Sequence, residues 1–185
     1  MPAAVPIKAI RMRVAAFFAL ALAPLAGRAQ DPEALRRTLP RLPATAASDA
    51  VETFRIAKGF RIELVASEPD VCSPVDMAFD EDGRLWVVEM IDYPYDEREG
   101  VPPQGRIRVL EDDDGDGRFG RSFIFADGLR WPTGLCLWDG GVFVASAPHI
   151  LYLKDTDGDH RADRKEVVFT GFRRDNVQAL LSNLR

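Results

Sequence analysis

The chain has 185 residues, and 24 Lys and Arg against 29 Asp and Glu give it a formal net charge of −5. Hydrophobic residues make up 46% of it and charged residues 29%, which excludes a wholly disordered chain. The acidic balance and the lack of a Lys/Arg-rich stripe argue against a nucleic-acid partner. Two cysteines and two histidines argue against a disulfide scaffold and a zinc site.

The first 29 residues have the pattern of a secretory signal peptide. Lys8, Arg11 and Arg13 precede an apolar run from Val14 to Leu25, which is too short to span a membrane as a helix, and small residues follow up to Ala29. We expect cleavage after Ala29, export to the periplasm or the cell surface, and no membrane span afterwards. The alternative is an uncleaved N-terminal anchor.

Residues 30–50 are rich in Pro, Ala and Arg and show no apolar period, which predicts a linker. Asp49 and Glu52 have the spacing of a helix start, so a short helical turn is expected to run to Phe54. Residues 51–185 are then expected to form the N-terminal part of one β domain.

The remainder of the chain repeats one pattern twice. The run PVDMAFDEDGRLWVVEM from Pro74 matches PTGLCLWDGGVFVASA from Pro132, and IRVLEDDDGDG from Ile107 matches ILYLKDTDGDH from Ile150. Asp112 and Asp155 are 43 residues apart. The first copy is longer because residues 91–104 are inserted in it.

Each copy predicts four strands, because short β-branched and aromatic runs alternate with Gly, Pro and Asp. The expected strands are Val75–Asp80, Leu85–Met90, Arg106–Asp112 and Ser122–Ala126, then Gly134–Trp138, Val142–Ala145, Ile150–Asp155 and Glu166–Thr170. The fold class is therefore all-β, and four strands per repeat favour a β-propeller with blades at about 74–128 and 132–171. The alternative is a β-sandwich of two four-stranded sheets.

Two blades cannot close a ring, since propellers use about four to eight. We therefore expect the chain to be the N-terminal part of a longer protein. A further strand is predicted over Phe60–Ser67, and in a closed ring it would be the outer strand of the last blade.

Several strings resemble the PVC-type membrane-bound dehydrogenase domain. They are GFRIELVASEPDVCSPVDMAFDEDGRLWVVEMIDYP, GRIRVLEDDDGDGRF, FADGLRWPTGL, APHILYLKDTDGDHRAD and FTGFRRDNVQALLSNLR. That domain is similar to glucose/sorbosone dehydrogenase propellers, so the resemblance implies six blades and oxidation of a sugar or alcohol. It also implies an electron acceptor or C-terminal c-type haem domain and pyrroloquinoline quinone in the full-length protein. This chain contains no C-x-x-C-H motif, so no haem c is expected in it.

Two acidic loops predict structural Ca²⁺ sites. Asp112, Asp114 and Asp116 match positions 1, 3 and 5 of a calcium loop, and Gly117 matches position 6. The second copy has Asp155, Asp157, Asp159, Asp163 and Glu166 at positions 1, 3, 5, 9 and 12, but His160 at position 6. The alternative is a pair of metal-free turns, which Asp and Gly also favour.

The candidate catalytic and binding residues gather at the opposite ends of the predicted strands. By analogy with sugar dehydrogenases, Glu89 or His149 would accept a hydroxyl proton, and Arg130 would stabilise negative charge. The other candidates at this end, for the substrate or cofactor, are Asp92, Tyr93, Trp131 and Asn176. The alternatives are a His149 without a role, a Glu89 paired with Arg130 or another cation, and packing roles for the aromatic residues.

Two further questions stay open. A Cys72–Cys136 disulfide is compatible with export, but Cys136 also fits as a small core residue of an inner strand. The chain is either part of an exported dehydrogenase or a non-catalytic propeller, stiffened by Ca²⁺, that binds carbohydrate or a protein partner. The fold alone does not decide between the two.

Overall fold

The computed structural model describes residues 43–95, 100–176 and 178–184. The chain divides into two units, Met1–Ala44 and Thr45–Arg185, and the description below concerns the second. The predicted signal peptide and residues 30–42 of the predicted linker lie outside the described residues. Within the described ranges, no helix has the length and apolar character needed to cross a membrane.

A short helical segment opens the second unit. Helix α2 spans Ala47–Ala50 and continues into the 3-10 turn Val51–Thr53. The helical turn expected at Asp49 is therefore present, although it begins two residues earlier and has no side-chain cap.

The strand predicted over Phe60–Ser67 is absent from the structure, and this expectation was wrong. Its backbone has no neighbouring strand to pair with among the described residues, and an isolated strand is not stable. One backbone bond ties it to the sheets, from the Phe119 N–H to the Val65 carbonyl at 3.2 Å.

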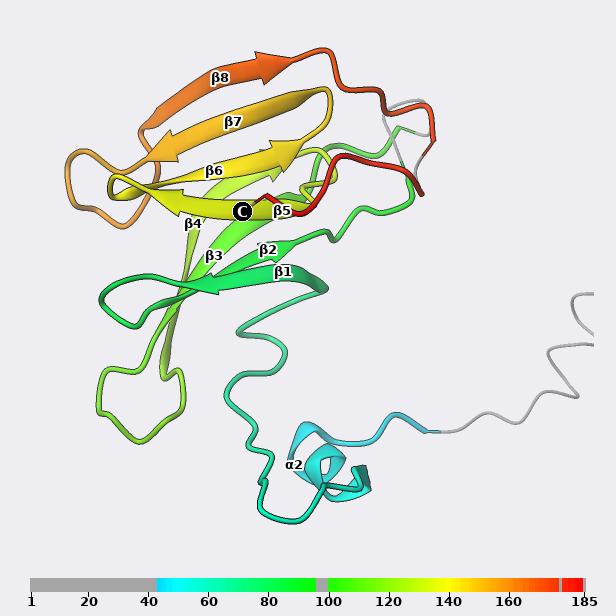
Figure 1. The fold of residues 1–185 in the computed structure, drawn as a ribbon, viewed down its shortest axis with the longest axis vertical. Helices are drawn as coiled ribbons and strands as arrows, with labels where there is room; N and C mark the ends of the chain where they lie inside the picture. The colour runs from blue at the N-terminus through cyan, green and yellow to red at the C-terminus, as the bar shows by residue number, and fades with distance from the viewer. Residues whose placement is uncertain (1–42, 96–99, 177, 185) are drawn as a thin grey trace, which may run out of the picture. The chain divides into compact units, whose positions relative to one another are not determined.

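Two four-stranded antiparallel sheets make up the rest, so the all-β prediction is confirmed (Figure 1). Sheet 1 has the order β1-β2-β3-β4 and sheet 2 the order β5-β6-β7-β8. The strands are β1 (Pro74–Phe79), β2 (Leu85–Glu89), β3 (Gly105–Glu111), β4 (Arg121–Leu129), β5 (Gly134–Trp138), β6 (Gly141–Ser146), β7 (His149–Lys154) and β8 (Arg164–Thr170). All eight predicted strands are present. The largest shifts lie at the end of β4 and the start of β8.

Each sheet has two apolar faces, because successive side chains of a strand point to opposite sides. We call one side the front face; in sheet 1 it carries Ala78, Trp86, Val88, Ile107 and Val109. The other side is the back face, which carries Met77, Phe79, Leu85, Val87 and Leu110 in sheet 1. In sheet 2 the equivalent front residues are Cys136, Phe143, Ala145, Ile150 and Tyr152, and the back residues are Leu135, Leu137, Val142, Val144, Leu151 and Leu153.

The main core forms where the front face of sheet 1 packs against the back face of sheet 2. Trp86, Val88 and Ile107 from the first face share one cluster with Val142 and Val144 from the second, and all are buried. The first strands β1 and β5 make the most extensive contact between the sheets. Asp76 in β1 fastens them together, because its Oδ2 accepts the Leu135 N–H at 3.1 Å.

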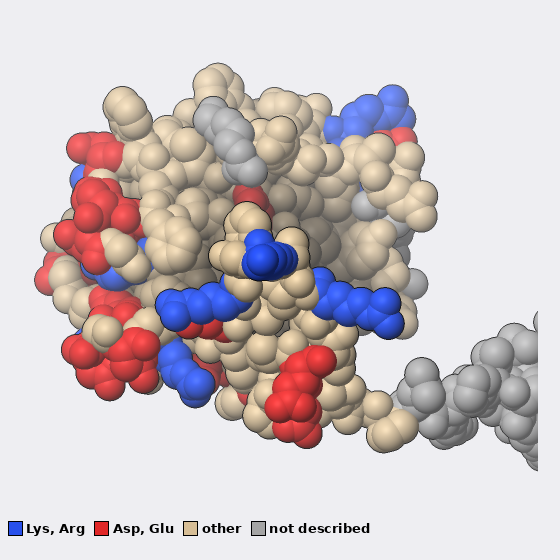
Figure 2. Space-filling view, turned by 60° about the horizontal axis from the view of Figure 1, so that its bottom comes forward, with Lys and Arg blue, Asp and Glu red and all other residues tan. Residues whose placement is uncertain are grey.

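The up-and-down order of the strands separates the connections into two ends. The turns at residues 80–84, 112–120, 139–140 and 155–163 lie at one end, which we call the acidic end. Acidic side chains gather along this side of the surface, at the left of Figure 2. The connection between β2 and β3, described over residues 90–95 and 100–104, belongs to the other end, which we call the insertion end. The links at 130–133 and 147–148 and the described part of the segment after β8 belong to it as well.

Candidate functional site

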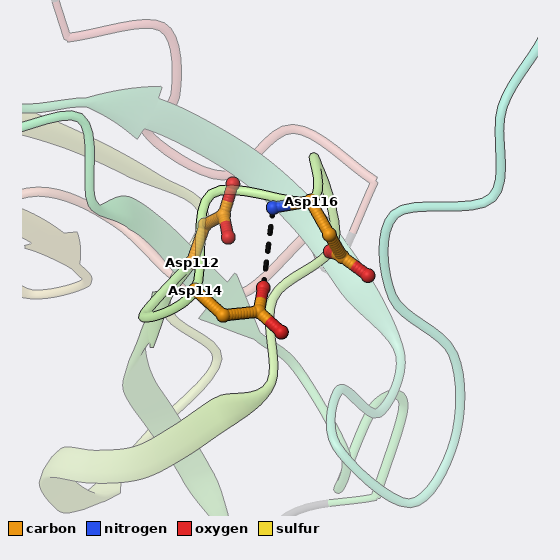
Figure 3. A group of neighbouring side chains, drawn as sticks. All are labelled: Asp112, Asp114 and Asp116. Atoms are coloured by element: carbon orange, nitrogen blue, oxygen red, sulfur yellow. Dashed lines mark hydrogen bonds between the residues drawn. The ribbon is translucent and has the colours of Figure 1, made fainter.

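The first acidic loop gathers its three aspartates in a tight turn. One carboxylate oxygen from each of Asp112, Asp114 and Asp116 lies within 4.8 Å of the others (Figure 3). Asp112 accepts the N–H groups of Gly115 at 2.7 Å and Gly117 at 3.0 Å. The Asp116 N–H donates to Asp114 Oδ1 at 3.1 Å. These bonds fix the backbone so that the three carboxylates lie together.

The second acidic loop has the same hydrogen-bond scheme. Asp155 accepts the N–H groups of Gly158 at 2.7 Å and His160 at 2.9 Å, and the Asp159 N–H donates to Asp157 Oδ1 at 3.3 Å. Asp155, Asp157 and Asp159 again bring one oxygen each within 4.8 Å. His160 takes a left-handed φ of 69°, in the place where Gly117 has 86°. The backbone therefore turns alike in both loops although the residue differs.

The later ligand positions are not gathered into either cluster. In the first loop they hold Gly120 and Phe123, which offer no side-chain oxygen. In the second loop Asp163 accepts the backbone N–H of Thr156 at 2.9 Å and its hydroxyl at 2.5 Å, while Glu166 pairs with Arg164 at 2.8 Å. Of the eight predicted metal residues, six therefore lie in clusters and two have other partners.

Hydrogen bonds lower the pKa of two of these carboxyl groups, which favours their negatively charged forms. The N–H group of Gly158 lowers the pKa of Asp155 most, and the N–H groups of His160, Asp157 and Asp159 lower it further. The Thr156 hydroxyl lowers the pKa of Asp163. Carboxylates on alternate residues of a turn are the ligands that Ca²⁺ takes, so the residues present fit this cation. A hydrogen-bonded carboxylate oxygen has a second lone pair with which it could coordinate.

At the insertion end, Glu89 is part of a buried charge cluster. Its side chain has no exposed surface, and it pairs with Arg108 at 2.7 Å and Arg106 at 3.6 Å from the neighbouring strand β3. Its Oε1 also accepts the Cys72 N–H at 2.7 Å, which ties the chain before β1 to the sheet. Glu89 is thus paired with two cations of β3, Arg108 and Arg106.

Arg130 belongs to a second cluster that holds the insertion. Its guanidinium pairs with the buried Asp92 at 2.9 Å and donates to the carbonyls of Tyr95 and Val101. The Trp131 indole also donates to the Tyr95 carbonyl, at 3.1 Å. This arrangement clamps both sides of the insertion onto the link between β4 and β5.

The remaining candidate residues of this end, Tyr93, His149 and Asn176, each make a different contact. Tyr93 packs edge-on against Trp131, with ring centroids 6.1 Å apart. The Nδ1 of His149 lies 2.9 Å from the Thr170 hydroxyl, and its ring is partly exposed. Asn176 is exposed and accepts the Gln178 N–H at 3.0 Å. The structure thus brings Asp92, Tyr93, Arg130 and Trp131 together, while the recorded contacts of His149 and Asn176 are with other residues.

Several important polar residues were not singled out by the sequence. Asp80 accepts bonds from Arg84 Nε at 2.6 Å and Trp86 Nε1 at 2.8 Å, and it lines a pocket of about 210 Å³ between the β1–β2 and β5–β6 turns. Asp76 joins the two sheets. Arg106 lies opposite Glu89 in the register of β2 and β3. Cys72 and Cys136 both carry free thiols.

Comparison with known proteins gives a family but no characterised relative. The model of a family described as "Domain of unknown function (DUF7133)" matches residues 46–185. Among curated proteins no sequence matches, and no solved structure matches either. The matched span contains both sheets, both acidic loops and the insertion end, and the chain belongs to the DUF7133 family.

Proposed function

We propose that the two sheets are neighbouring blades of a β-propeller and that their acidic loops bind Ca²⁺. The packing of the faces supports the blade assignment. In a two-sheet sandwich the outward faces are usually polar. Here the outward face of sheet 2 carries Phe143, Ile150 and Tyr152, which repeat the core-facing positions of sheet 1. Such a repeated front-to-back contact is heterologous, and it closes into a ring when the rotation between units permits it.

A second contact supports the same assignment. Ala162 and Phe119 are the eighth residues of their acidic loops, and each donates its N–H to the segment that lies against the back face of its own sheet. Ala162 donates to the Phe125 carbonyl of β4 at 2.8 Å, and Phe119 donates to the Val65 carbonyl at 3.2 Å. Val65 therefore has the same place beside sheet 1 that the outer strand β4 has beside sheet 2.

One observation carries the calcium proposal. Two loops 43 residues apart hold three carboxylates each with the same hydrogen bonds, although one loop has glycine at the sixth position and the other has histidine. Three carboxylates within 4.8 Å repel each other, and a bound cation relieves this repulsion. Because each loop also donates to the preceding segment, a cation bound there would stiffen the joint between blades.

Calcium titration tests this proposal. We expect Ca²⁺ at millimolar concentration to raise the melting temperature of the chain, and Mg²⁺ to raise it less, because Ca²⁺ accepts irregular oxygen geometry. The double variant Asp155→Asn/Asp157→Asn should lose about half of the shift, and adding Asp112→Asn/Asp114→Asn should abolish it. Glu81→Gln removes a charge at the same end outside both loops and is the matched control. No shift in the unmodified chain, or the same shift in all variants, contradicts the proposal.

A second function rests on the resemblance to the PVC-type membrane-bound dehydrogenase domain. In this proposal the exported chain is part of a sugar or alcohol dehydrogenase that uses pyrroloquinoline quinone and passes electrons to an acceptor or c-type haem domain. Tyr93, which is 40% exposed, and the partly exposed His149 both belong to the insertion end, and ligands of propellers commonly bind at one end of the ring. Glu89 is neutralised by Arg108, so the partly exposed His149 is the better proton acceptor of this end.

Dye-linked oxidation of a panel of sugars and alcohols by the full-length protein, with added pyrroloquinoline quinone, tests the second function. We expect turnover that falls at least tenfold in His149→Asn, whereas His160→Asn at the other end should keep it. If the unmodified protein binds the quinone but oxidises no substrate, the dehydrogenase proposal is wrong. The alternative is then a non-catalytic propeller whose ligand is a carbohydrate or a protein partner.

A further inference from the structure

His149 and Thr170 form a side-chain pair at the insertion end of sheet 2. They lie directly opposite each other in the register of β7 and β8, and the Nδ1 of His149 is 2.9 Å from the hydroxyl oxygen of Thr170. Residues directly opposite in an antiparallel pair share one side of the sheet, where their side chains meet. Thr170 has no part in either function proposed above.

Hydrogen bonds fix the backbone on both sides of this pair. The carbonyl of Pro148, which precedes the histidine, accepts the N–H groups of Gly171 at 3.0 Å and Phe172 at 3.3 Å, which follow the threonine. The register partner of the histidine in β6 is Ser146, whose hydroxyl donates to the Arg130 carbonyl at 2.8 Å. The strand ends that carry the pair are therefore tied to each other and to the link between β4 and β5.

The pair belongs to the side of sheet 2 that faces sheet 1. Ser146 alternates along β6 with the back residues Val142 and Val144, so its register partner His149 is also on the back side. The back face of sheet 2 packs against sheet 1 in the main core. The position of the imidazole is therefore set by the two sheets described here, and it does not depend on what covers the front face of sheet 2.

The contact with Thr170 gives the two ring nitrogens of His149 different roles. A neutral imidazole carries one N–H proton, and the bond made by one nitrogen sets which of the two carries it. Thr170 is exposed, so its own hydrogen can stay bonded to water while a lone pair of its oxygen accepts the Nδ1–H. Among the described residues, Nε2 has no hydrogen-bond partner, which leaves its lone pair open to a substrate.

We propose that Thr170 is a positioning residue that holds His149 with its proton on Nδ1, so that Nε2 accepts the proton of a substrate hydroxyl. The proposal rests on the dehydrogenase function proposed above. In that reaction the hydroxyl proton moves to Nε2 and the hydrogen on the same carbon leaves as hydride to the quinone, so the alcohol becomes a carbonyl. The imidazolium keeps its Nδ1–H bond to Thr170, which holds the ring in place throughout the transfer.

Nuclear magnetic resonance of the chain with ¹⁵N-labelled histidine measures the tautomer directly. The chain has two histidines, and His160→Asn removes the other one, so the remaining ring signals belong to His149. In the neutral ring we expect the proton on Nδ1. Thr170→Val keeps the β-branched shape but lacks the hydroxyl, so the proton should move to Nε2, which an imidazole without such a partner prefers. Thr170→Ser retains the hydroxyl and should keep the proton on Nδ1.

Dye-linked oxidation by the full-length protein gives a second, independent readout. Thr170→Val should lower kcat about fivefold with little change in KM, because the ring remains but is no longer aligned, and Thr170→Ser should restore the rate. Thr53→Val removes an exposed threonine hydroxyl elsewhere and should change neither the tautomer nor the rate.

The two readouts separate a failure of this proposal from a failure of the dehydrogenase function. A proton on Nε2 in the unmodified chain, the same tautomer in Thr170→Val, or an unchanged kcat in that variant would overturn the positioning role. If the tautomers are as expected but the unmodified protein oxidises no substrate, the dehydrogenase function is wrong, and the assignment of the proton to Nδ1 by Thr170 stands.

Discussion

Glu89 and Arg108 form an ion pair inside sheet 1, with Arg108 Nε 2.7 Å from Glu89 Oε1 and neither side chain more than 9% exposed. Arg108 also donates to the Ser122 hydroxyl, which in turn donates to the Asp70 carbonyl. The pair therefore connects β2, β3 and β4 to the segment that precedes β1.

Removing one partner of this pair should destabilise the fold strongly. Glu89→Gln leaves the Arg108 charge buried without its counter-charge, for which we expect a loss of about 3–5 kcal/mol in the free energy of unfolding. Urea denaturation measures it. The control is Glu111→Gln, which breaks an exposed pair with Arg121 and should change stability by less than about 1 kcal/mol. Equal effects of the two variants would show that Glu89 is not held as described.

The Asp80 carboxyl should make the free energy of unfolding depend on pH, with a sign that follows from its lowered pKa. Burial raises the pKa of its carboxyl, but hydrogen bonds from Trp86 and Arg84 outweigh burial and hold the pKa below its ordinary value. Such a group stabilises the fold above its unfolded pKa of 3.8 and loses this contribution as the pH falls through the folded pKa. We expect Asp80→Asn to lower the free energy of unfolding at about pH 7 and to differ little from the unmodified chain at about pH 2. Asp139→Asn, in the equivalent turn, is the control, and a deficit independent of pH would contradict the assignment.

Arg130 should stabilise the conformation of the insertion more than that of the two sheets. Arg130→Gln removes the clamp on the Tyr95 and Val101 carbonyls, so cleavage next to these residues by an added protease should become at least tenfold faster. Mass spectrometry of the fragments locates the cuts. Arg173→Gln breaks an exposed local pair and should leave the cleavage pattern unchanged. Cuts that appear first within β6 or β7 would instead show that Arg130 supports the sheets.

Substitution of Leu153 tests whether the two sheets share one hydrophobic core. It is 1% exposed on the back face of sheet 2, and Leu153→Ala should lower the free energy of unfolding by about 2–5 kcal/mol in one cooperative transition. Val167→Ala on the exposed strand β8 is the control and should cost under about 1 kcal/mol. If Leu153→Ala separates the transition into two steps, the sheets are independent rather than joined through one core.

The sequence predicts the strands well because their signals are local. Ala78, Trp86 and Val88 alternate with residues of the opposite face, and Gly and Asp mark the turns between strands. The segment Phe60–Ser67 has the same local pattern, yet it forms no strand, because a strand also needs a neighbour with which to pair. The sequence pattern of this segment is that of a strand, but it does not show whether a neighbouring strand is available for pairing.

The candidate sites were predictable as groups of residues and less so as contacts. The Asp-x-Asp-x-Asp spacing was enough to place three carboxylates together, since their geometry is set within one turn. Asp163 and Glu166 followed the same spacing but found Thr156 and Arg164 as nearer partners. The clamp of Asp92 by Arg130 joins residues 38 positions apart, and no local pattern reports such a contact.

The bond from the Leu135 N–H to Asp76 has a consequence for how the two sheets can move. β1 and β5 share no ladder of backbone hydrogen bonds, so packing alone would let one sheet slide along the other. A directional bond near the starts of both strands opposes that sliding at the insertion end, and the bond from the Ala162 N–H to the Phe125 carbonyl opposes it at the acidic end. Because the two bonds lie at opposite ends of the strands, together they resist both sliding of one sheet along the other and rotation between them.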